Sequence, residues 1–356
     1  MERVVILNNV LQELISSASA ELFGLKSGET VIVSSLVEKN GLEKVGVCSE
    51  QNDEQHDGLL FDLIGGQLRC QKKKGERFSD VPVEVVDYFT DFHARNQGIV
   101  DASVLQQQKV VVIGLGSGGS GIALDLLRAG VVRQCWIDFD VVSVSNLCRS
   151  AYDLTDVGRR KTDALLDKAL RVNPNAEISC FAENVLEVDY NHLAEIVDSA
   201  DLVIDCTDTV KSKILLNGMA YNKKPVLFPA VYDLGQGGDI LVTVPGVTPC
   251  FECVMQAIIP QMQNVSRGDW DYSAGQAKPM PALLSDIKIV VSRTVKIALA
   301  ILLSDKENSL LEKVMVPGCS LLLIGNEADF WIFEEPFSEV WVKTEVNPEC
   351  SCQTLR

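Results

Sequence analysis

A glycine-rich stretch between an apolar run and a helical segment constrains this chain more than any other feature. Residues 109–121 read KVVVIGLGSGGSG. Val110 to Ile113 form a short β-branched run, which is typical of a buried parallel strand, and Ile122 to Val132 are predicted to form a helix. Strand, glycine loop and helix in this order predict a phosphate-binding turn, because glycine lets backbone N–H groups approach a ligand closely. A tight turn without a ligand would show the same pattern, so a second motif is needed.

Asp138 supplies that second motif. It stands about 20 residues beyond the last glycine of the motif, in the segment Arg133 to Asp140, which reads as the next strand. An acid at this spacing binds ribose hydroxyls in Rossmann-type proteins. Together the two motifs predict a nucleotide site, and at this point both nicotinamide and adenine nucleotides fit it.

Composition narrows the class of protein. A chain of 356 residues with 47% hydrophobic and 23% charged residues has the make-up of a globular protein. The net charge of −17 disfavours a nucleic-acid or acidic-lipid surface, and the apolar segment Ile287 to Leu303 carries three basic residues, so it is a poor membrane span. The chain has eleven cysteines, and its first residues do not read as a secretory signal peptide. We therefore expect free thiols or a metal site rather than a framework of disulfides. We therefore expect a cytoplasmic protein that binds neither nucleic acid nor membrane.

Strands and helices alternate after about residue 95. Thr162 to Val172 has helical periodicity, and further strands are expected at Leu202–Ile204, Pro225–Phe228 and Asp239–Val244. This alternation predicts an α/β fold with a Rossmann-like, doubly wound and mostly parallel sheet. A small α+β domain of unknown role is expected at residues 1–90, ahead of the larger domain at 91–356.

The pattern of the first 94 residues predicts several short elements. They are a helix at Val4–Ile15, a hairpin of Thr30–Val37 with Leu42–Cys48 around Asn40-Gly41, a hairpin of Leu59–Ile64 with Gln67–Cys70 around Gly65-Gly66, a solvated turn at Lys72–Lys74, and a connecting helix at Val85–Ala94.

Four separated motifs carry a family resemblance. GLGSGGSG, DFDVVSVSNLCR, VGRRK and IDCTDT occur in this order. Over roughly residues 95–352 the chain therefore resembles the MoeB/ThiF family, which includes the adenylation domains of ubiquitin-activating enzymes. The resemblance implies ATP- and magnesium-dependent adenylation of the C-terminal glycine carboxylate of a ubiquitin-like or sulfur-carrier protein, as a possible first step of ubiquitin-like conjugation. It also implies a homodimer and, where conjugation follows, a conjugating enzyme as a further partner.

The resemblance also implies roles for individual residues. It assigns Gly114, Gly116, Gly118 and Gly119 to the nucleotide, Asp138 to the ribose, Asn146, Arg149 and Lys161 to the phosphates, Asp208 to magnesium, and Arg95 to the ATP site of the partner subunit. These residue types suit the chemistry, because a C-terminal carboxylate with a pKa of about 3.5 is already ionised and needs no general base. Catalysis then consists of positioning and of neutralising charge on phosphate oxygens.

Simpler interpretations of the same residues stay open. Arg149 and Lys161 could be surface charges, Asp208 a helix N-cap, and Arg95 a cap of the preceding helix. The chain also departs from the family pattern. Thr209 and Lys213 stand where the family usually has Asn and Arg, and Cys148 and Ser150 flank Arg149 in place of the commoner Asn or Gln.

Two cysteine pairs suggest a metal. Cys250 and Cys253 form a CxxC half-site, and Cys350 and Cys352 form a CxC pair near the end of the chain. Without the resemblance the two pairs could be incidental. With it, they are expected to hold a structural zinc, because four thiolates fill a tetrahedral site.

The sequence leaves a second reaction step open. The polar segment 261–281 reads as a long loop and contains no cysteine, although Ser266 or Ser273 could carry an oxyester. Cys135, Cys180 and Cys319 sit in apolar surroundings and are expected in the core, and the strand-end position of Cys206 also suits packing. Two other functions remain, a non-catalytic scaffold of the same family and a NAD-dependent oxidoreductase that shares only the Rossmann turn.

Overall fold

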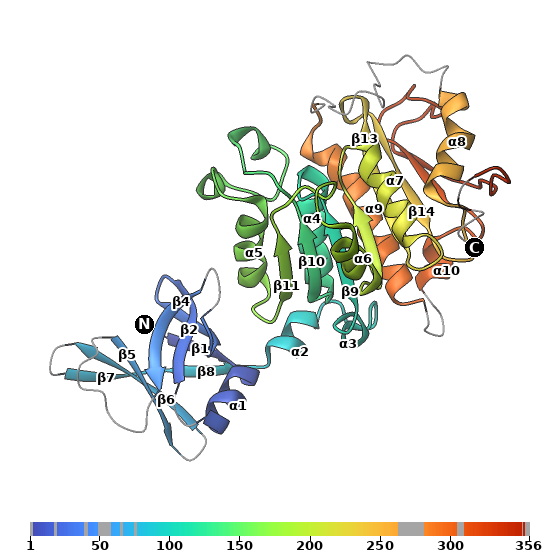
Figure 1. The fold of residues 1–356 in the computed structure, drawn as a ribbon. Helices are drawn as coiled ribbons and strands as arrows, with labels where there is room; N and C mark the ends of the chain where they lie inside the picture. Colours follow the sequence, from blue (N-terminus) through green and yellow to red (C-terminus); the bar gives the residue numbers. More distant parts are fainter. Residues whose placement is uncertain are drawn as a thin grey trace. The chain divides into compact units, whose positions relative to one another are not determined.

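The chain forms two compact units. The computed structural model describes residues 3–17, 20–38, 42–48, 58–64, 67–74, 77–262, 281–304, 310–350 and 352. The first unit comprises Met1–Ile99 with Leu166–Asn175, and the second comprises Val100–Leu165 with Ala176–Arg356 (Figure 1). Residues 91–99 and Leu166–Asn175 thus belong to the first unit, although the sequence pattern predicted them in the second domain.

In the described residues, the first unit contains an eight-stranded sheet on which helix α1 (Asn8–Ser17) packs. The strand order is β7-β6-β5-β4-β2-β3-β1-β8, and helix α1 buries Val10, Leu11 and Leu14 against the sheet. The strands are β1 (Arg3–Leu7), β2 (Ala20–Ser27), β3 (Thr30–Ser35), β4 (Glu43–Cys48), β5 (Gly58–Ile64), β6 (Gln67–Lys74), β7 (Arg77–Val81) and β8 (Val83–Val86). Helix α2 (Tyr88–His93) follows β8, with Asp87 as its N-cap.

Several predictions for this unit are wrong. The predicted helix at Val4–Ile15 begins only at Asn8, because Val4 to Leu7 form strand β1, which pairs in parallel with β3 and β8. The helix predicted at Val85–Ala94 begins at Tyr88, since the β-branched residues before it complete β8. Lys72–Lys74 is strand rather than turn, because β6 pairs with β7 along this stretch.

One of the two predicted hairpins has a different pairing. Strand β3 pairs with β1 and β2, and β4 pairs with β2 and β5, so β3 and β4 are not neighbours. Strand β2, which lies between them in the sheet, was not predicted. The other hairpin is confirmed, because β5 and β6 are antiparallel with Ile64 opposite Gln67. The turn residues 39–41 and 65–66 lie outside the described residues.

The second unit contains the predicted doubly wound sheet. Its strand order is β11-β10-β9-β12-β13-β14-β15-β16, in which the first five strands are parallel and the last three run antiparallel to their neighbours. The strands are β9 (Lys109–Ile113), β10 (Arg133–Ile137), β11 (Glu177–Phe181), β12 (Leu202–Asp205), β13 (Val226–Tyr232), β14 (Gly237–Thr243), β15 (Leu321–Gly325) and β16 (Ser338–Val342). The chain leaves β9 toward β10 on one side and returns to β12 on the other, so the order reverses at β9, where such sheets bind ligands.

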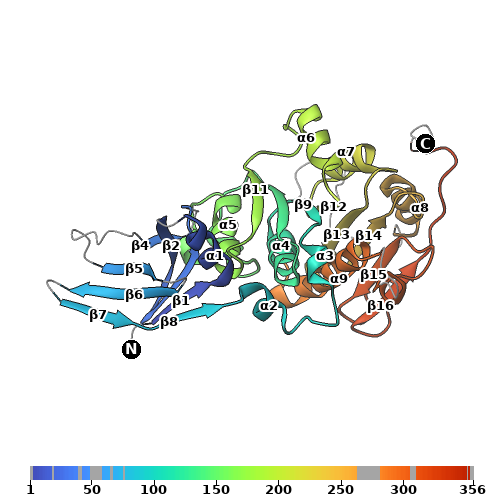
Figure 2. The same cartoon turned by 90° about the horizontal axis from the view of Figure 1, so that it is seen from below.

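Helices cover both faces of this sheet. Figure 2 shows α4 and α9 on one face and α6, α7 and α8 on the other. The helices are α3 (Ala102–Leu105), α4 (Ser117–Ala129), α5 (Lys161–Val172), which spans the division between the units, α6 (Tyr190–Asp198), α7 (Val210–Ala220), α8 (Phe251–Met262), α9 (Leu284–Leu302) and α10 (Leu310–Val314), with short 3-10 turns at Val144–Asn146, Leu154–Asp156 and Asp233–Gly235. None of the described helices has the length and apolarity needed to cross a membrane.

Candidate nucleotide site and cysteine cluster

The glycine turn between β9 and α4 contains glycines of two kinds. Gly114 has a φ of +82°, and a Cβ there would lie 3.0 Å from the carbonyl carbon of Cys206. A Cβ on Gly119 would lie 1.8 Å from the Gly114 carbonyl oxygen. These two positions need glycine for close packing on the sheet. Gly116 and Gly118 face open space instead, since a Cβ at either position would meet no atom closer than 4.0 Å, and no side chain caps the start of α4. The turn therefore packs tightly at Gly114 and Gly119 and is open at Gly116 and Gly118.

Asp138 lies at the end of β10, directly beside this turn. Its Oδ2 accepts a hydrogen bond from the Leu115 N–H at 2.6 Å, and its Oδ1 accepts one from the Asp140 N–H at 2.8 Å. The residue is only 8% exposed, and burial raises the pKa of Asp138 above its ordinary value, although nearby Lys161 acts in the opposite direction. Each carboxylate oxygen can still accept one further hydrogen bond.

Lys161 is the first residue of α5, and its ammonium lies beside the carboxylates of Asp138 and Asp140. It is 2.6 Å from Asp140 Oδ2 and 3.9 Å from Asp138 Oδ2, and the residue is 6% exposed. The interpretation of Lys161 as a plain surface charge is therefore wrong. Its main carboxylate partner, Asp140, is half-exposed and was not singled out from the sequence.

The loop between β10 and α5 places Asn146 and Arg149 near the start of α4. The Ala151 N–H donates to Ser120 Oγ at 3.2 Å, and the buried Tyr152 hydroxyl donates to the Leu115 carbonyl at 2.8 Å. These bonds fix the loop to the glycine turn. Asn146 Oδ1 accepts a hydrogen bond from the Ser143 N–H at 2.9 Å, which leaves the amide Nδ2 of Asn146 as the donor that a ligand could use.

The residues that depart from the family pattern around Arg149 support the same loop. The Ser150 hydroxyl donates to the Asn146 carbonyl at 2.6 Å, and the Cys148 thiol donates to the Ser145 carbonyl at 3.4 Å. Arg149 itself is partly buried.

The acidic turn, residues 206–209 between β12 and α7, follows the strand on the other side of β9 and forms the other side of the candidate site. Asp208 is exposed, and Thr209 is the N-cap of α7, since its hydroxyl accepts from the Ser212 N–H. The interpretation of Asp208 as the helix N-cap is therefore wrong. The turn lies against the glycine motif, because the Cys206 N–H donates to the Ile113 carbonyl at 2.8 Å.

The structure thus brings together most of the predicted nucleotide-site residues. The glycine turn, Asp138, Asn146, Arg149, Lys161 and Asp208 all belong to the second unit, and they lie at the carboxyl ends of β9, β10 and β12, on the loops that follow them or at the start of the next helix. Arg95 belongs to the first unit, where it is exposed in the turn after α2, and Ala94 rather than Arg95 is the C-cap of that helix.

Two buried acids near this group were not predicted from the sequence. Asp205, at the end of β12, is fully buried and lies 3.8 Å from the ammonium of Lys213. Asp239, on β14, accepts a hydrogen bond from the Tyr232 hydroxyl at 2.7 Å, and burial raises the pKa of Asp239 to about 7. Strand-end acids followed by a lysine on the next helix are the signal that could have pointed to Asp205.

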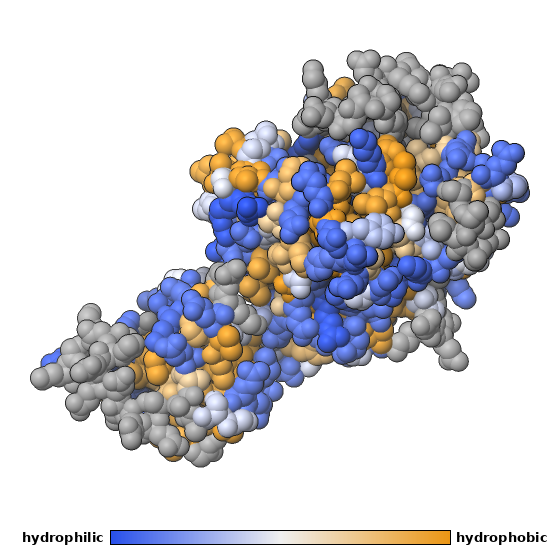
Figure 3. Space-filling view, viewed as in Figure 1, coloured by the Kyte–Doolittle hydropathy of each residue, from blue (hydrophilic) through white to orange (hydrophobic). Residues whose placement is uncertain are grey.

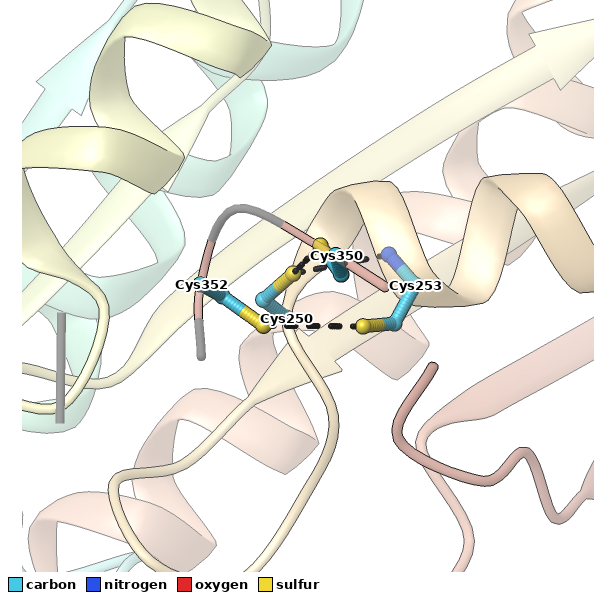
Figure 4. A group of neighbouring side chains, drawn as sticks. All are labelled: Cys250, Cys253, Cys350 and Cys352. Atoms are coloured by element: carbon cyan, nitrogen blue, oxygen red, sulfur yellow. Dashed lines mark hydrogen bonds between the residues drawn. The ribbon is translucent and has the colours of Figure 1, made fainter. Parts of the chain in front are cut away.

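The cysteine cluster lies at the N-terminal end of α8. Figure 4 shows Cys250, Cys253, Cys350 and Cys352 turned toward one another, with all four sulfur atoms within 4.8 Å. The Sγ atoms of Cys250 and Cys350 are 3.7 Å apart, and those of Cys253 and Cys352 are 3.6 Å apart. All four residues are buried, and the Cys253 and Asn347 N–H groups each donate to a cluster sulfur at 3.4 Å. The chain therefore gathers four thiols in a closed arrangement that could hold one metal ion.

The other cysteines lie mainly in packed surroundings. Cys135 and Cys319 are buried and Cys180 is partly buried, as expected for core thiols. Burial raises the pKa of Cys206 to about 12, so at neutral pH its sulfur is a thiol rather than a nucleophilic thiolate. Ser266 and Ser273, the candidates for an oxyester, lie outside the described residues.

The loop that carries Asn146 and Arg149 also exposes apolar side chains. These are Phe139, Val141, Val144, Leu154 and Val157, which are between 37% and 76% exposed. Figure 3 shows orange surface at the upper left of the second unit, where Figure 1 shows the β10–α5 connection. A group of exposed apolar residues on one loop is typical of a surface that another protein covers.

Comparison with known proteins gives a family match. The sequence profile of the ThiF family matches residues 93–315, which is more than half of the chain. The chain is 28% identical over 224 residues to Ubiquitin-like modifier-activating enzyme 5 of Caenorhabditis briggsae, and 32% identical over 151 residues to Molybdopterin-synthase adenylyltransferase of Escherichia coli. These alignments cover 59% and 42% of this chain and 52% and 59% of the relatives, so the chain spans about half the length of the curated relatives it matches.

Solved structures share the fold. A crystal structure of E. coli MccB with AMPCPP and MccA has a TM-score of 0.56 at 19% identity, with 74% of each chain covered. A crystal structure of PaaA has a TM-score of 0.53 at 20% identity, with 77% of this chain and 78% of that chain covered. The Rossmann-like architecture predicted from the sequence is confirmed.

Proposed function

Because the chain belongs to the ThiF family, we propose that it binds ATP and adenylates the C-terminal glycine carboxylate of a ubiquitin-like or sulfur-carrier protein. The observation that carries this proposal is the meeting of three groups at the point where the strand order reverses. They are the open glycine turn, the buried pair of Asp138 with Lys161, and the exposed Asp208. Two of the relatives are named as an adenylyltransferase and as an enzyme that activates a ubiquitin-like modifier, which is consistent with this chemistry.

The residues suit an attack by a carboxylate on the α-phosphate of ATP. The carrier's C-terminal carboxylate is ionised near neutral pH, so it can attack directly, and pyrophosphate leaves. The N–H groups at the open start of α4 would bind phosphate oxygens. Asn146 Nδ2, Arg149 and Lys161 would add donors and positive charge, and Asp138 would accept a hydrogen bond from a ribose hydroxyl.

Asp208 is the residue we assign to magnesium. Magnesium in nucleotide sites is held by one or two carboxylates together with phosphate oxygens and water, and an exposed carboxylate at the rim of the turn fits this donor set. When bound, the ion would neutralise charge on the phosphates. Arg95 of a second copy would supply a further positive charge, so we propose a homodimer.

The cysteine cluster is the site that we assign to a structural zinc. Zn–S distances of about 2.3 Å in a tetrahedron place sulfur atoms about 3.8 Å apart, close to the 3.6 and 3.7 Å separations of the two sulfur pairs. Four sulfur ligands leave no open position, so the zinc would stabilise the fold and take no part in the reaction.

The remaining parts of the proposal concern partners and location. The exposed apolar side chains on the β10–α5 loop, Phe139 among them, offer a surface for a protein partner such as the second copy. The carrier's adenylate would be the starting point for a conjugating enzyme if the protein serves a tagging pathway. None of the eleven cysteines, all of which the structure describes, forms a disulfide, which fits a reducing compartment, and we place the protein in the cytoplasm.

ATP–pyrophosphate exchange tests the proposed reaction. The wild-type protein is incubated with ATP, labelled pyrophosphate and purified ubiquitin-fold proteins that end in Gly-Gly as candidate carriers. Exchange should depend on both magnesium and carrier, and Asp208→Ala should abolish it with the fold intact. Asp198→Ala changes an exposed carboxylate on α6 and should leave the exchange unchanged.

Three outcomes would contradict the proposal. Asp208→Ala with wild-type exchange would exclude Asp208 as the metal ligand. Carrier binding without any exchange would favour the non-catalytic scaffold, and tight binding of NAD with no binding of ATP would favour the oxidoreductase.

A further inference from the structure

Lys213 lies on α7, next to the acidic turn, and is 9% exposed. Its ammonium donates to the Thr207 carbonyl at 3.0 Å and to the Asp205 carbonyl at 3.4 Å. The Lys213 Nζ atom is 3.8 Å from Asp205 Oδ2 and 5.8 Å from the ring centroid of Phe228. An ammonium has three N–H donors, and these contacts direct them to the protein itself. Lys213 is therefore placed to hold the turn and not to bind a phosphate.

The buried carboxylate of Asp205 also holds the turn through hydrogen bonds. Asp205 accepts hydrogen bonds from the Thr207 N–H at 2.9 Å, from the Thr207 hydroxyl at 2.7 Å and from the Ser212 hydroxyl at 3.2 Å. The next carboxylate along the chain, Asp208, is exposed. The turn thus fixes its backbone through one buried aspartate and one buried lysine and presents the second aspartate outward.

Charge balance explains why a cation is needed at this position. Asp205 and Asp239 are both buried, and Lys213 interacts with both of them, since it also lowers the pKa of Asp239 against the effect of burial. Tyr232, which donates to Asp239, carries no charge. Without the ammonium, two buried carboxylates would lack a compensating charge, and the turn would have to rearrange or take up protons.

We infer that Lys213 is a positioning residue for the metal ligand Asp208. By holding the carbonyls of Asp205 and Thr207, Lys213 sets the backbone from which the Asp208 carboxylate reaches the nucleotide. This inference rests on the proposed function, because that proposal assigns magnesium to Asp208. It also explains why lysine can stand where the family usually has arginine, since a buried cation that bonds two carbonyls satisfies the turn with either side chain.

Binding of Mn²⁺ in the presence of ATP, followed by electron paramagnetic resonance, tests the inference without relying on turnover. Lys213→Met should weaken Mn²⁺ binding about tenfold or more, as the loss of a residue that orients a metal ligand does. Its affinity for ATP without metal should stay within about twofold of wild type, because the Lys213 ammonium donates to main-chain carbonyls of the protein itself. Lys213→Arg should bind Mn²⁺ like the wild-type protein. Lys211→Met, which removes an exposed lysine from the same helix, is the matched control and should have no effect.

A second variant covers the case in which Lys213→Met does not fold. Asp205→Asn with Lys213→Met removes the ammonium together with the carboxylate that lies 3.8 Å from it, and Asp239, with a pKa of about 7, can take up a proton. This double variant should fold and still bind Mn²⁺ weakly, because the bonds to the two carbonyls remain absent. Wild-type Mn²⁺ affinity in either variant would overturn the inference. Equal losses of ATP affinity with and without metal would also overturn it, since they would mean that Lys213 acts on the nucleotide itself.

Hydrogen exchange separates this inference from the proposed function. If the wild-type protein binds neither ATP nor Mn²⁺, the proposed function fails, and with it the assignment of a metal to Asp208. The role of Lys213 in holding the turn is then judged by the amides of Thr207 to Thr209 in the unliganded protein. Lys213→Met should speed up their exchange and Lys211→Met should not, and unchanged exchange in Lys213→Met would overturn that role as well.

Discussion

The two strands that flank β9 end in similar groups of residues with different contacts. At the end of β10, Asp138 is buried, Asp140 follows two residues later, and Lys161 approaches from the next helix. At the end of β12, Asp205 is buried, Asp208 follows, and Lys213 approaches from the next helix. In both places the buried aspartate accepts backbone N–H groups and the lysine is less than one-tenth exposed.

The partners of the two lysines differ. Lys161 forms its closest contact with the half-exposed carboxylate of Asp140, at 2.6 Å. A phosphate oxygen can replace such a side-chain partner. Lys213 donates to two main-chain carbonyls, which cannot leave without unfolding the turn. The same pair of residue types therefore gives a charge available to a ligand beside β10 and a fixed support beside β12.

Replacement of Lys161 should have the largest effect on activity. Lys161→Ala removes a charge that we expect to contact the phosphates in the transition state, so kcat/KM for ATP–pyrophosphate exchange should fall by about a thousandfold. ATP affinity without metal should fall as well, in contrast to Lys213→Met. A loss smaller than about tenfold in exchange would mean that the two lysines have the same supporting role.

Arg95 extends the comparison to a charge from another unit of the chain. If it acts in the neighbouring subunit, Arg95→Ala and Asp208→Ala should each be inactive alone. Random mixing makes half of the dimers hybrid, and half of the sites in a hybrid are intact, so the mixture should recover up to about a quarter of wild-type exchange. No recovery, in a mixture where hybrids are demonstrated by mass spectrometry of tagged chains, would show that Arg95 does not act between subunits.

The cysteine cluster contrasts with both lysine groups because it is closed to ligands. We expect about one zinc per chain in the purified protein, and Cys352→Ser should lose it and unfold at lower temperature, since binding energy at a structural zinc contributes to folding. Cys148→Ser, which changes an exposed thiol on the β10–α5 loop, is the control and should keep the metal. Metal analysis by mass spectrometry with a thermal unfolding scan decides this. A metal-free wild-type protein of equal stability would mean that the cluster is only packing.

The second unit could be predicted well from the sequence because its signals are local. The glycine turn, the β-branched strands and the spacing to Asp138 each follow from neighbouring residues, and the ThiF profile confirms the family resemblance. The contacts of Asp205 with Lys213 were not predicted, because an ion pair inside a turn leaves no periodic pattern. That Thr209 rather than Asp208 is the N-cap of α7 was not predicted either, because this choice depends on the local backbone.

The first unit was harder to predict because its pairings are not local. Strand β2 lies between β3 and β4 in the sheet, so the Asn40-Gly41 signal suggested a hairpin between strands that are not neighbours. Val4 and Leu7 fit one helix face together with Leu11 and Leu14, yet parallel pairing with β3 and β8 makes residues 4–7 a strand. Such tertiary pairing overrides local propensity.

The smallest expected effect is a pH dependence of stability that originates at Asp239, the second acid near Lys213. Burial raises the pKa of Asp239 to about 7 in the folded protein. Between about pH 4 and pH 7 the Asp239 carboxyl is therefore protonated in the folded state and ionised in the unfolded chain. This group stabilises the fold below about pH 4 and loses that contribution as the pH rises to about 7. Asp239→Asn keeps an acceptor for Tyr232 but cannot ionise, so its stability relative to wild type should increase by about 2 kcal/mol between pH 5 and pH 8.

Tryptophan fluorescence in urea measures this difference selectively, because all four tryptophans belong to the second unit. Tyr232→Phe removes a hydrogen bond that favours the carboxylate, so the pKa of Asp239 should rise further and the loss of stability should extend to higher pH. Lys213→Met should shift the profile in the same direction, because it removes the compensating charge. Asp198→Asn, on the surface of α6, should show no pH-dependent difference. Parallel profiles for Asp239→Asn and wild type would mean that Asp239 is already ionised at pH 5, and that Lys213 compensates both buried acids more fully than its contact with Asp205 alone requires.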